Sequence, residues 1–373
     1  MKKNILFICV SLFFFSCKDK DNAVIDCPVL NIDVPSDNSP SMGEILYIPL
    51  ETNEKYLIGN VDKIIYRTDR FYIFDRGSKA VFVFNEKGKF LYDIQKVGTG
   101  PGEYIDPSDI DVDKLGNVYI SDNPTQKVIK YISGDVNRFE TIDIGKYFLD
   151  FVVTDSNLIY LGDMVNNKCM NIRLAKFEKD SKKVSILQTC EFEHRKVIPK
   201  FSQHYFFRSG DLIHYYKRFS PYIYSIENGA VTEKIRLDSD KFPPKELIDS
   251  WSNDGDIEKM KADKKYIKDI SAYYETNNAL FITLREGSLQ QVVVDKASGK
   301  VYKFNSFSNK KFYGYIGAYS VSRDYFVSYC FPSINKINDI LLHNPNINGE
   351  RKRMLSSLNE ESNPILILFN FVF

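Results

Sequence analysis

The sequence predicts an all-β fold, a six-bladed β-propeller of four-stranded antiparallel blades. A strand-rich phrase occurs twice, as FYIFDRGSKAVFVF from Phe71 and VYISDNPTQKVIKY from Val118, so that equivalent residues lie 47 positions apart. A repeat of this length, rich in strand-forming residues, is typical of propeller blades. The composition agrees, because 14% of the residues are aromatic and aromatic side chains favour strands. Closed all-β folds of this length form single domains.

The two copies of the phrase define the first two blades. In the first, strands are expected over 71–74 and 80–84, with a polar turn over 75–79 between them. A second turn, Asn85-Glu86-Lys87-Gly88, leads to a strand over 90–94. Strands expected over 105–112, 117–121 and 127–132 repeat the plan.

Four weaker copies follow. They open at 157–160, 211–214, 279–282 and 324–327. Aligning one residue from each of the six copies gives spacings of 47, 40, 54, 67 and 46 residues. A mean of about 51 residues suits four short strands and their turns, and the count of copies predicts six blades.

Two helical segments interrupt the strand pattern. The longest spacing contains a small helical insertion near 241–265, opened by Pro243-Pro244. A short C-terminal helix over 350–358 precedes an apolar strand over 365–369. Because an open ring would leave unpaired edges, we expect the strand at 365–369 to share the last blade with the N-terminal strand at 45–50.

The N-terminus predicts export. Lys2 and Lys3 precede an apolar stretch over 5–15 that is too short to span a bilayer, so 1–16 is predicted to be a signal peptide. Ser16-Cys17 at its end resembles a bacterial lipobox, which implies lipidation of Cys17. The polar stretch over 17–41 is predicted to be a flexible tether, with the propeller over 42–373. The expected location is the outer membrane of the cell envelope, on its periplasmic or cell-surface side.

Several motifs together resemble a known family. They are the LETN opening at Leu50, FDRGSKAVFVF, the GxGPGEY loop from Gly98, DVDKLGNVYISD at 111–122 and the terminal NPILILF. With the lipobox, this set resembles the six-bladed β-propeller lipoproteins of Bacteroidales, which are similar in form to NHL-type propellers. The resemblance implies the fold and the envelope location, and it supplies no catalytic residues.

The glycine-rich loop at 98–102 does not predict a nucleotide site. A dinucleotide fingerprint requires a following helix, whereas here a strand-like segment with an internal Pro107 follows. A lysine paired with Ser or Thr, which would complete a phosphate-binding P-loop, is missing from this segment. We interpret the loop as a tight crossover between the first two blades.

The crossover loop and the turns between second and third strands should share one face of the ring. Six residues on these segments are candidates for a ligand face: Arg76, Glu103, Tyr104, Asp122, Arg218 and Arg285. Such a set suits an anionic or hydroxylated ligand, or the edge of a protein. The alternative is that they are solvated turn residues.

Other chemistry has little support in the sequence. His194, His204 and His214 are spaced by ten, which favours structural histidines over metal ligands. Asp106, Asp109, Asp111 and Asp113 fit strand ends and turns. We expect no catalytic motif, no metal and no cofactor, although a glycosidase-type carboxylate pair could still form in three dimensions. Cys169 and Cys190 flank a polar turn, and both a disulfide and two free thiols remain open.

These observations favour an exported, lipid-anchored binding or protein-interaction module, expected to be a monomer with a protein or glycan ligand. The balance of 50 basic and 49 acidic residues argues against nucleic acid. The alternative function is a propeller enzyme of the glycoside hydrolase or lyase type. A deep central pocket with two carboxylates, or with Arg, Tyr and His together, would favour the enzyme. A flat charged mouth would favour the binding module.

Overall fold

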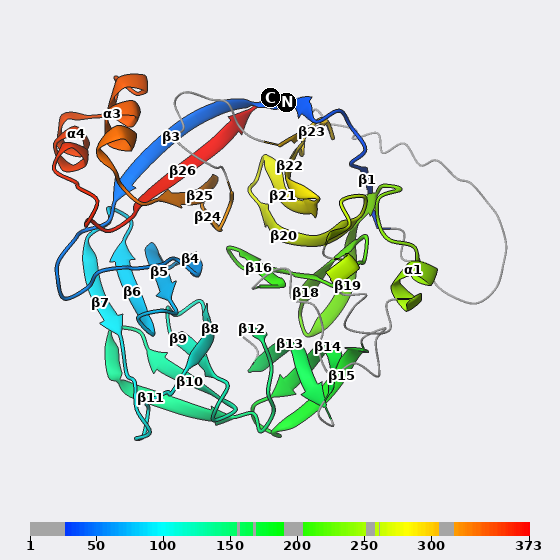
Figure 1. The fold of residues 1–373 in the computed structure, drawn as a ribbon. Coiled ribbons are helices and arrows are strands. Elements are labelled where there is room, and N and C mark those ends of the chain that lie inside the picture. The colour runs from blue at the N-terminus through cyan, green and yellow to red at the C-terminus, as the bar shows by residue number, and fades with distance from the viewer. Residues whose placement is uncertain are drawn as a thin grey trace, which may run out of the picture.

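The computed structural model describes residues 27–154, 157–166, 169–189, 204–250, 258–260, 262–305 and 317–373. Six sheets form a closed ring around a central axis (Figure 1). Each sheet is one blade, and one of its edge strands lies nearest the axis. The predicted six-bladed β-propeller is therefore confirmed.

The first three blades take consecutive strands from inside to outside. Blade 1 consists of β4 (Lys63–Arg67), β5 (Arg70–Asp75), β6 (Ala80–Asn85) and β7 (Phe90–Ile94). Blade 2 consists of β8 (Pro107–Val112), β9 (Val118–Asp122), β10 (Lys127–Ile132) and β11 (Asp135–Asp143). Blade 3 consists of β12 (Asp150–Val153), β13 (Leu158–Asn166), β14 (Cys169–Glu178) and β15 (Lys183–Thr189).

The other three blades each gain a strand from the N-terminal segment. Blade 4 consists of β16 (Phe206–Ser209), β17 (Leu212–Tyr216), β18 (Tyr222–Glu227), β19 (Ala230–Asp238) and β1 (Val29–Asn31). Blade 5 consists of β20 (Ile267–Glu275), β21 (Ala279–Glu286), β22 (Ser288–Asp295), β23 (Val301–Phe304) and β2 (Asp37–Asn38). Blade 6 consists of β24 (Ser320–Ser322), β25 (Tyr325–Cys330), β26 (Ile365–Val372) and β3 (Ser41–Pro49).

All six repeated phrases correspond to the second strand of a blade. Blade 6 closes the ring as predicted, because β3 pairs antiparallel with β26 and Ile48 lies opposite Leu366. The segment before β3 differs from the flexible tether expected over 17–41. Its strand β1 pairs parallel with β19, and β2 pairs with β23, so the chain contacts blades 4 and 5 before it completes blade 6.

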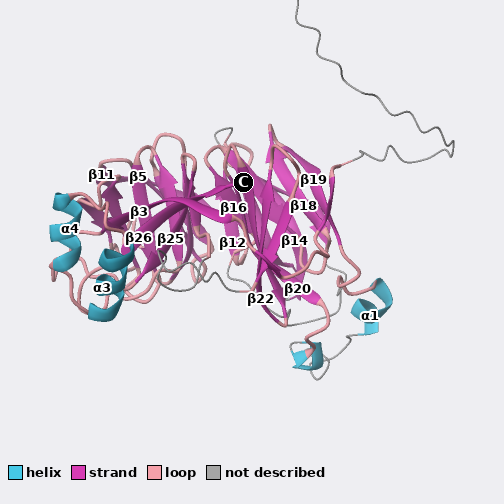
Figure 2. Ribbon diagram, turned by 90° about the horizontal axis from the view of Figure 1, so that it is seen from above, coloured by secondary structure: helices cyan, strands magenta, loops and turns pink. Residues whose placement is uncertain are grey.

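The helices lie in two connections. The predicted insertion contains α1 (Lys245–Ser250) and a further helical turn at 258–260, between blades 4 and 5. Blade 6 carries α3 (Ile334–His343) and α4 (Gly349–Ser356) between β25 and β26. The prediction included α4 but not α3. In the side view, α1 and α3 lie on the same side of the ring (Figure 2).

The core lies between neighbouring blades. Between blades 1 and 2, for example, Phe74 and Val83 pack in one buried cluster with Ile110 and Ile120. Each such side chain contributes about 1.5–3 kcal/mol when fully buried. Because every blade is covered on both faces by its neighbours, the inner strands are held in fixed positions around the axis. That arrangement positions the side chains described next.

Candidate functional site

A cluster of charged side chains lies where the inner strands begin. Lys63 is the first residue of β4, Asp109 lies near the start of β8, Asp150 begins β12, and His204 comes just before β16. These four strands belong to four consecutive blades. Strand order in an antiparallel blade places these ends on the face that also carries the crossover loops and the turns between second and third strands.

Asp109 is the centre of the cluster. Its Oδ1 lies 2.9 Å from Lys63 Nζ and 3.3 Å from His204 Nδ1. Its Oδ2 accepts hydrogen bonds from Lys63 Nζ and from the Phe151 amide, at 3.1 and 3.3 Å. The carboxylate is completely buried, and this burial raises its pKa well above the ordinary value, although the charge on Lys63 opposes the shift.

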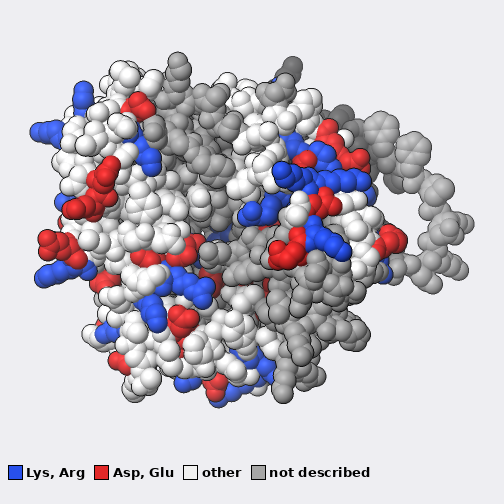
Figure 3. Space-filling model, viewed as in Figure 1, with Lys and Arg blue, Asp and Glu red and all other residues white. Residues whose placement is uncertain are grey.

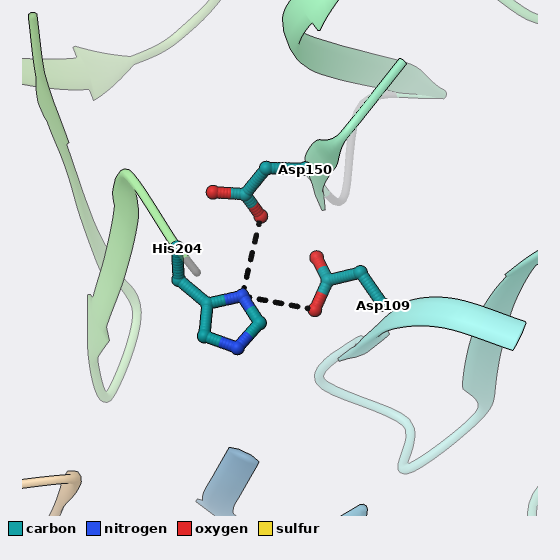
Figure 4. A group of neighbouring side chains, drawn as sticks. All are labelled: Asp109, Asp150 and His204. Atoms are coloured by element: carbon teal, nitrogen blue, oxygen red, sulfur yellow. Dashed lines mark ion pairs between the residues drawn. The ribbon is translucent and has the colours of Figure 1, made fainter. Parts of the chain in front are cut away.

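Asp150 is the second buried carboxylate. Its Oδ2 accepts hydrogen bonds from the amides of Tyr205 and Phe206, at 2.5 and 3.1 Å. Its Oδ1 lies 3.7 Å from His204 Nδ1. Burial opposes ionisation of Asp150, but His204 and Lys63 together hold its pKa below the ordinary value. Figure 4 shows Asp109 and Asp150 both facing the same nitrogen of His204.

Further charged pairs follow along the inner strands. Asp111, two residues after Asp109, accepts a bidentate pair of hydrogen bonds from Arg208, at 3.1 and 2.7 Å. At the far end of β4, Arg67 pairs with Asp211 at 2.8 Å. A void of about 20 Å³ lies next to Lys63 and Arg208, enough for about one water molecule. The inner strands therefore carry several paired charges around the axis.

A pocket of about 450 Å³ lies beside the cluster. Lys63 and His204 line it together with Ser271, Thr283 and Arg285. The pocket volume falls within the range of about 300–1,000 Å³ that is usual for small-ligand sites. Because Asp109 and Asp150 are buried behind Lys63 and His204, a ligand in the pocket would meet the two basic side chains first.

Two aromatic residues and a basic surround complete the pocket. Tyr274 and Tyr319 line it, and the Tyr274 hydroxyl donates to the Tyr319 carbonyl at 2.8 Å. Near Arg285, the carboxylate of Glu286 pairs with Lys241 and Lys303, at 2.5 and 2.9 Å. Lysine and arginine side chains also gather on the molecular surface in the region of α1 (Figure 3).

The six predicted ligand-face residues lie in different environments. Arg285 alone among them lines the central pocket. Arg76 lies on the rim, 3.9 Å from Asp106. Arg218 is buried and pairs with Asp163 at 2.5 Å, and Asp122 is buried and accepts from the Asp106 amide and the Thr125 hydroxyl. A ligand-binding role stays a prediction for each of them.

Glu103 and Tyr104 organise the glycine-rich crossover, which connects β7 to β8 as predicted. The Glu103 carboxylate accepts from the Gly100 amide at 2.8 Å. Tyr104 is buried, and its hydroxyl lies 2.8 Å from the Lys79 carbonyl and 3.0 Å from that of Ile94. Gly102 has a φ of +72°, a conformation that favours glycine. These contacts explain the motif through the shape of the loop.

The structure describes two of the three histidines considered from the sequence and little of the cysteines considered with them. His214 is buried, with Nε2 2.7 Å from Glu275, whose pKa is lowered to about 2 by His214 and Lys234 although burial opposes this. His204, also predicted to be structural, lies next to the buried carboxylates of Asp109 and Asp150 and lines the pocket. Cys17, His194, Cys190 and the side chain of Cys169 lie outside the described residues, so lipidation and the disulfide stay predictions.

Comparison with known proteins identifies the family. Residues 24–370 match the model of a family described as Domain of unknown function (DUF4934). The chain belongs to the DUF4934 family. A search of curated protein sequences finds no significant match.

Two solved structures support the fold of this DUF4934 protein. One is a candidate exported protein of Bacteroides fragilis NCTC 9343, with 18% identity, a TM-score of 0.73 and coverage of 93% of this chain and 99% of that one. The other is a member of the DUF4221 family from Bacteroides vulgatus ATCC 8482, with 11% identity, a TM-score of 0.53 and coverage of 90% and 98%. Among the described residues, no helix has the length and apolar character needed to cross a membrane.

Proposed function

We propose that this protein is an envelope-associated binding module that holds an acidic glycan in its central pocket. One observation carries the proposal. Arg285 lines the pocket, and the buried Nε of its guanidinium group has no hydrogen-bond partner among the described residues. A buried donor of this kind is costly unless a ligand satisfies it. A carboxylate or sulfate group would do so with two parallel hydrogen bonds.

The rest of the pocket suits the remainder of a sugar. Ser271 and Thr283 add hydroxyl groups to the lining, and the Thr283 hydroxyl, which donates to Gln291 Oε1 at 2.7 Å, can still accept a hydrogen bond from a sugar hydroxyl. Tyr274 and Tyr319 add aromatic surface, which combines an apolar ring with a polar tip.

The test is a binding screen of residues 27–373 against oligosaccharides with and without uronic acid or sulfate groups, and against acidic peptides. We expect binding to acidic oligosaccharides that Arg285→Ala weakens by about tenfold to a hundredfold, because a charge-assisted hydrogen bond contributes about 1.5–3 kcal/mol. The matched control is Arg76→Ala on the rim, which should bind as tightly as wild type. Binding confined to peptides, or hits that Arg285→Ala leaves unchanged, would reject the proposal.

A second candidate function is a propeller enzyme that cleaves such a glycan. The observation in its favour is that two carboxylates, His204 and Lys63 converge next to a pocket that also holds Arg285 and Tyr274. Buried carboxylates with divergent pKa values are typical of catalytic acids and bases. Mass spectrometry of each bound glycan after incubation with the protein distinguishes the two functions. An enzyme would release shorter products, and Asp109→Asn would prevent their release, whereas a binding module would leave the glycan intact.

Membrane attachment through Cys17 is the remaining part of the proposal. The supporting points are the signal peptide predicted from the sequence, the Ser16-Cys17 dipeptide and the similarity to a candidate exported protein. We expect the full chain to incorporate labelled fatty acid in a bacterial host and to sediment with membranes, and we expect Cys17→Ala to lose both properties. Labelling that persists in Cys17→Ala would place the lipid elsewhere.

A further inference from the structure

We infer that Asp109, Asp150 and His204 form a binding site for a divalent transition metal, with Zn²⁺ the best fit. Each of the three residues offers one ligand-type atom, and these atoms all lie within 4.8 Å of one another. His204 Nδ1 is the nitrogen that lies nearest to Asp109 Oδ1 and Asp150 Oδ1 in the ion pairs of this cluster. Figure 4 shows the three side chains facing one another across a common point, from three different blades.

The spacing suits metal coordination. Zn²⁺ binds nitrogen and oxygen ligands at about 2.0–2.2 Å, and in a tetrahedral site this places neighbouring ligand atoms about 3.3–3.6 Å apart. His204 Nδ1 lies 3.3 Å from Asp109 Oδ1 and 3.7 Å from Asp150 Oδ1. An imidazole with two carboxylates suits zinc better than calcium or magnesium, which prefer oxygen ligands alone.

Two of the three ligand atoms lack another partner. Asp150 is completely buried, yet neither its Oδ1 nor the buried Nδ1 of His204 has a hydrogen-bond partner among the described residues. Their separation of 3.7 Å is too long for a hydrogen bond between them. Buried polar atoms in this condition are rare in proteins and point to a missing ion or water. A metal would satisfy both atoms at once.

The other oxygen of each carboxylate is already held in place. Asp150 Oδ2 accepts from the amides of Tyr205 and Phe206, and Asp109 Oδ2 accepts from the Phe151 amide. These bonds aim each Oδ1 at the common point, as supporting contacts do around known metal sites. The ligands are therefore preorganised by backbone groups of two inner strands.

The local charge also favours a cation. Asp111 is compensated by Arg208, so the remaining buried charges near the point are two carboxylates and the ammonium of Lys63. Asp109 and Asp150 face the same nitrogen of His204, and two buried carboxylates this close together repel each other. A cation bound between them would relieve that repulsion. Lys63 can stay on Asp109 Oδ2 while the metal takes Oδ1, although the two cations repel each other.

The test is calorimetric titration of ZnCl2 into residues 27–373 that have been treated with a chelator and dialysed. We expect one zinc per chain, and we expect Asp150→Asn and His204→Ala each to weaken binding by about tenfold or more. Asp150→Asn keeps an oxygen for the amides of Tyr205 and Phe206, so the fold should survive. Circular dichroism and melting in the presence of chelator verify this for both variants.

Two further variants make the result specific. Lys63→Met should tighten zinc binding, because it removes the ammonium that competes with the metal for Asp109. If the carboxylates instead depend on Lys63 alone for charge balance, Lys63→Met would lower the stability of the protein and leave its zinc affinity no higher. The matched control, His343→Ala on α3, should leave binding unchanged. Absence of a stoichiometric site in the wild type, or binding that survives both Asp150→Asn and His204→Ala, would overturn the inference.

The proposals of a zinc site and of a glycan pocket can be tested independently, by zinc binding and by glycan binding. Arg285→Ala should leave zinc affinity unchanged, because Arg285 is not among the three ligands. Loss of glycan binding in Arg285→Ala with intact zinc binding would support both proposals. Zinc binding in a protein that binds no glycan would reject the proposed function and keep the metal site.

Discussion

Truncation after Asn363 should abolish cooperative folding of the ring. The deleted segment contains five consecutive buried apolar residues, 365–369, and together they contribute about 8–15 kcal/mol of transfer free energy. That range matches the whole stability of a typical domain, about 5–15 kcal/mol. The deletion also leaves the edges of β3 and β25 unpaired, and open edges promote association.

The measurement is thermal and urea unfolding of residues 27–363, followed by circular dichroism. We expect no cooperative transition and an increased tendency to aggregate. A control truncation after Phe371 removes Val372 and Phe373, which are 59% and 43% exposed, and should change the free energy of unfolding by about 1 kcal/mol or less. A shortened chain that melts like the wild type would show that β26 is not needed for closure.

Asp163→Ala should destabilise the protein by about 3–5 kcal/mol. Asp163 is buried between two buried arginines, with Oδ1 2.9 Å from Arg173 and Oδ2 2.5 Å from Arg218. The pair links blade 3 to blade 4, since Arg173 lies on β14 and Arg218 follows β17. Removing one partner of a buried ion pair is strongly destabilising because the remaining charge stays desolvated.

Urea unfolding gives the free energies for this comparison. The control is Glu86→Ala, which removes one of the two carboxylates that pair with Arg323. The side chains of Glu86 and Arg323 are 45% and 65% exposed, and the expected cost is below about 1 kcal/mol. Equal effects of the two substitutions would contradict the structural importance assigned to the buried network.

Much of the fold could be predicted from the sequence because short segments of alternating apolar residues and turns recur in each blade. The second strand of each blade repeats with alternating apolar residues, and a ring of such blades must close on itself. A signal for α3 was also present, since Ser333 caps it and Ile337 and Ile340 follow at helical spacing, but the prediction omitted it. The strands β1 and β2 were missed because VLN and DN are too short to show a period.

The candidate site could not be predicted from sequence patterns. Asp109, Asp150 and His204 are separated by 41 and 54 residues along the chain. They form no local motif, because each lies near the start of a different inner strand. They come together because the ring brings these strand ends to one axis. Asp109 was therefore interpreted as a strand-end residue and His204 as a structural histidine. Arg285 was predicted from its turn, because turns between second and third strands share a face.

The most direct test of the proposed site is a crystal structure of residues 27–373 with the tightest-binding acidic oligosaccharide from the screen. We expect ligand density in the central pocket, with an acidic group bound by Arg285 and sugar hydroxyls near Ser271 and Thr283. Density found only on the rim beside Arg76, or on the opposite face beside Arg67 and Asp211, would contradict this expectation.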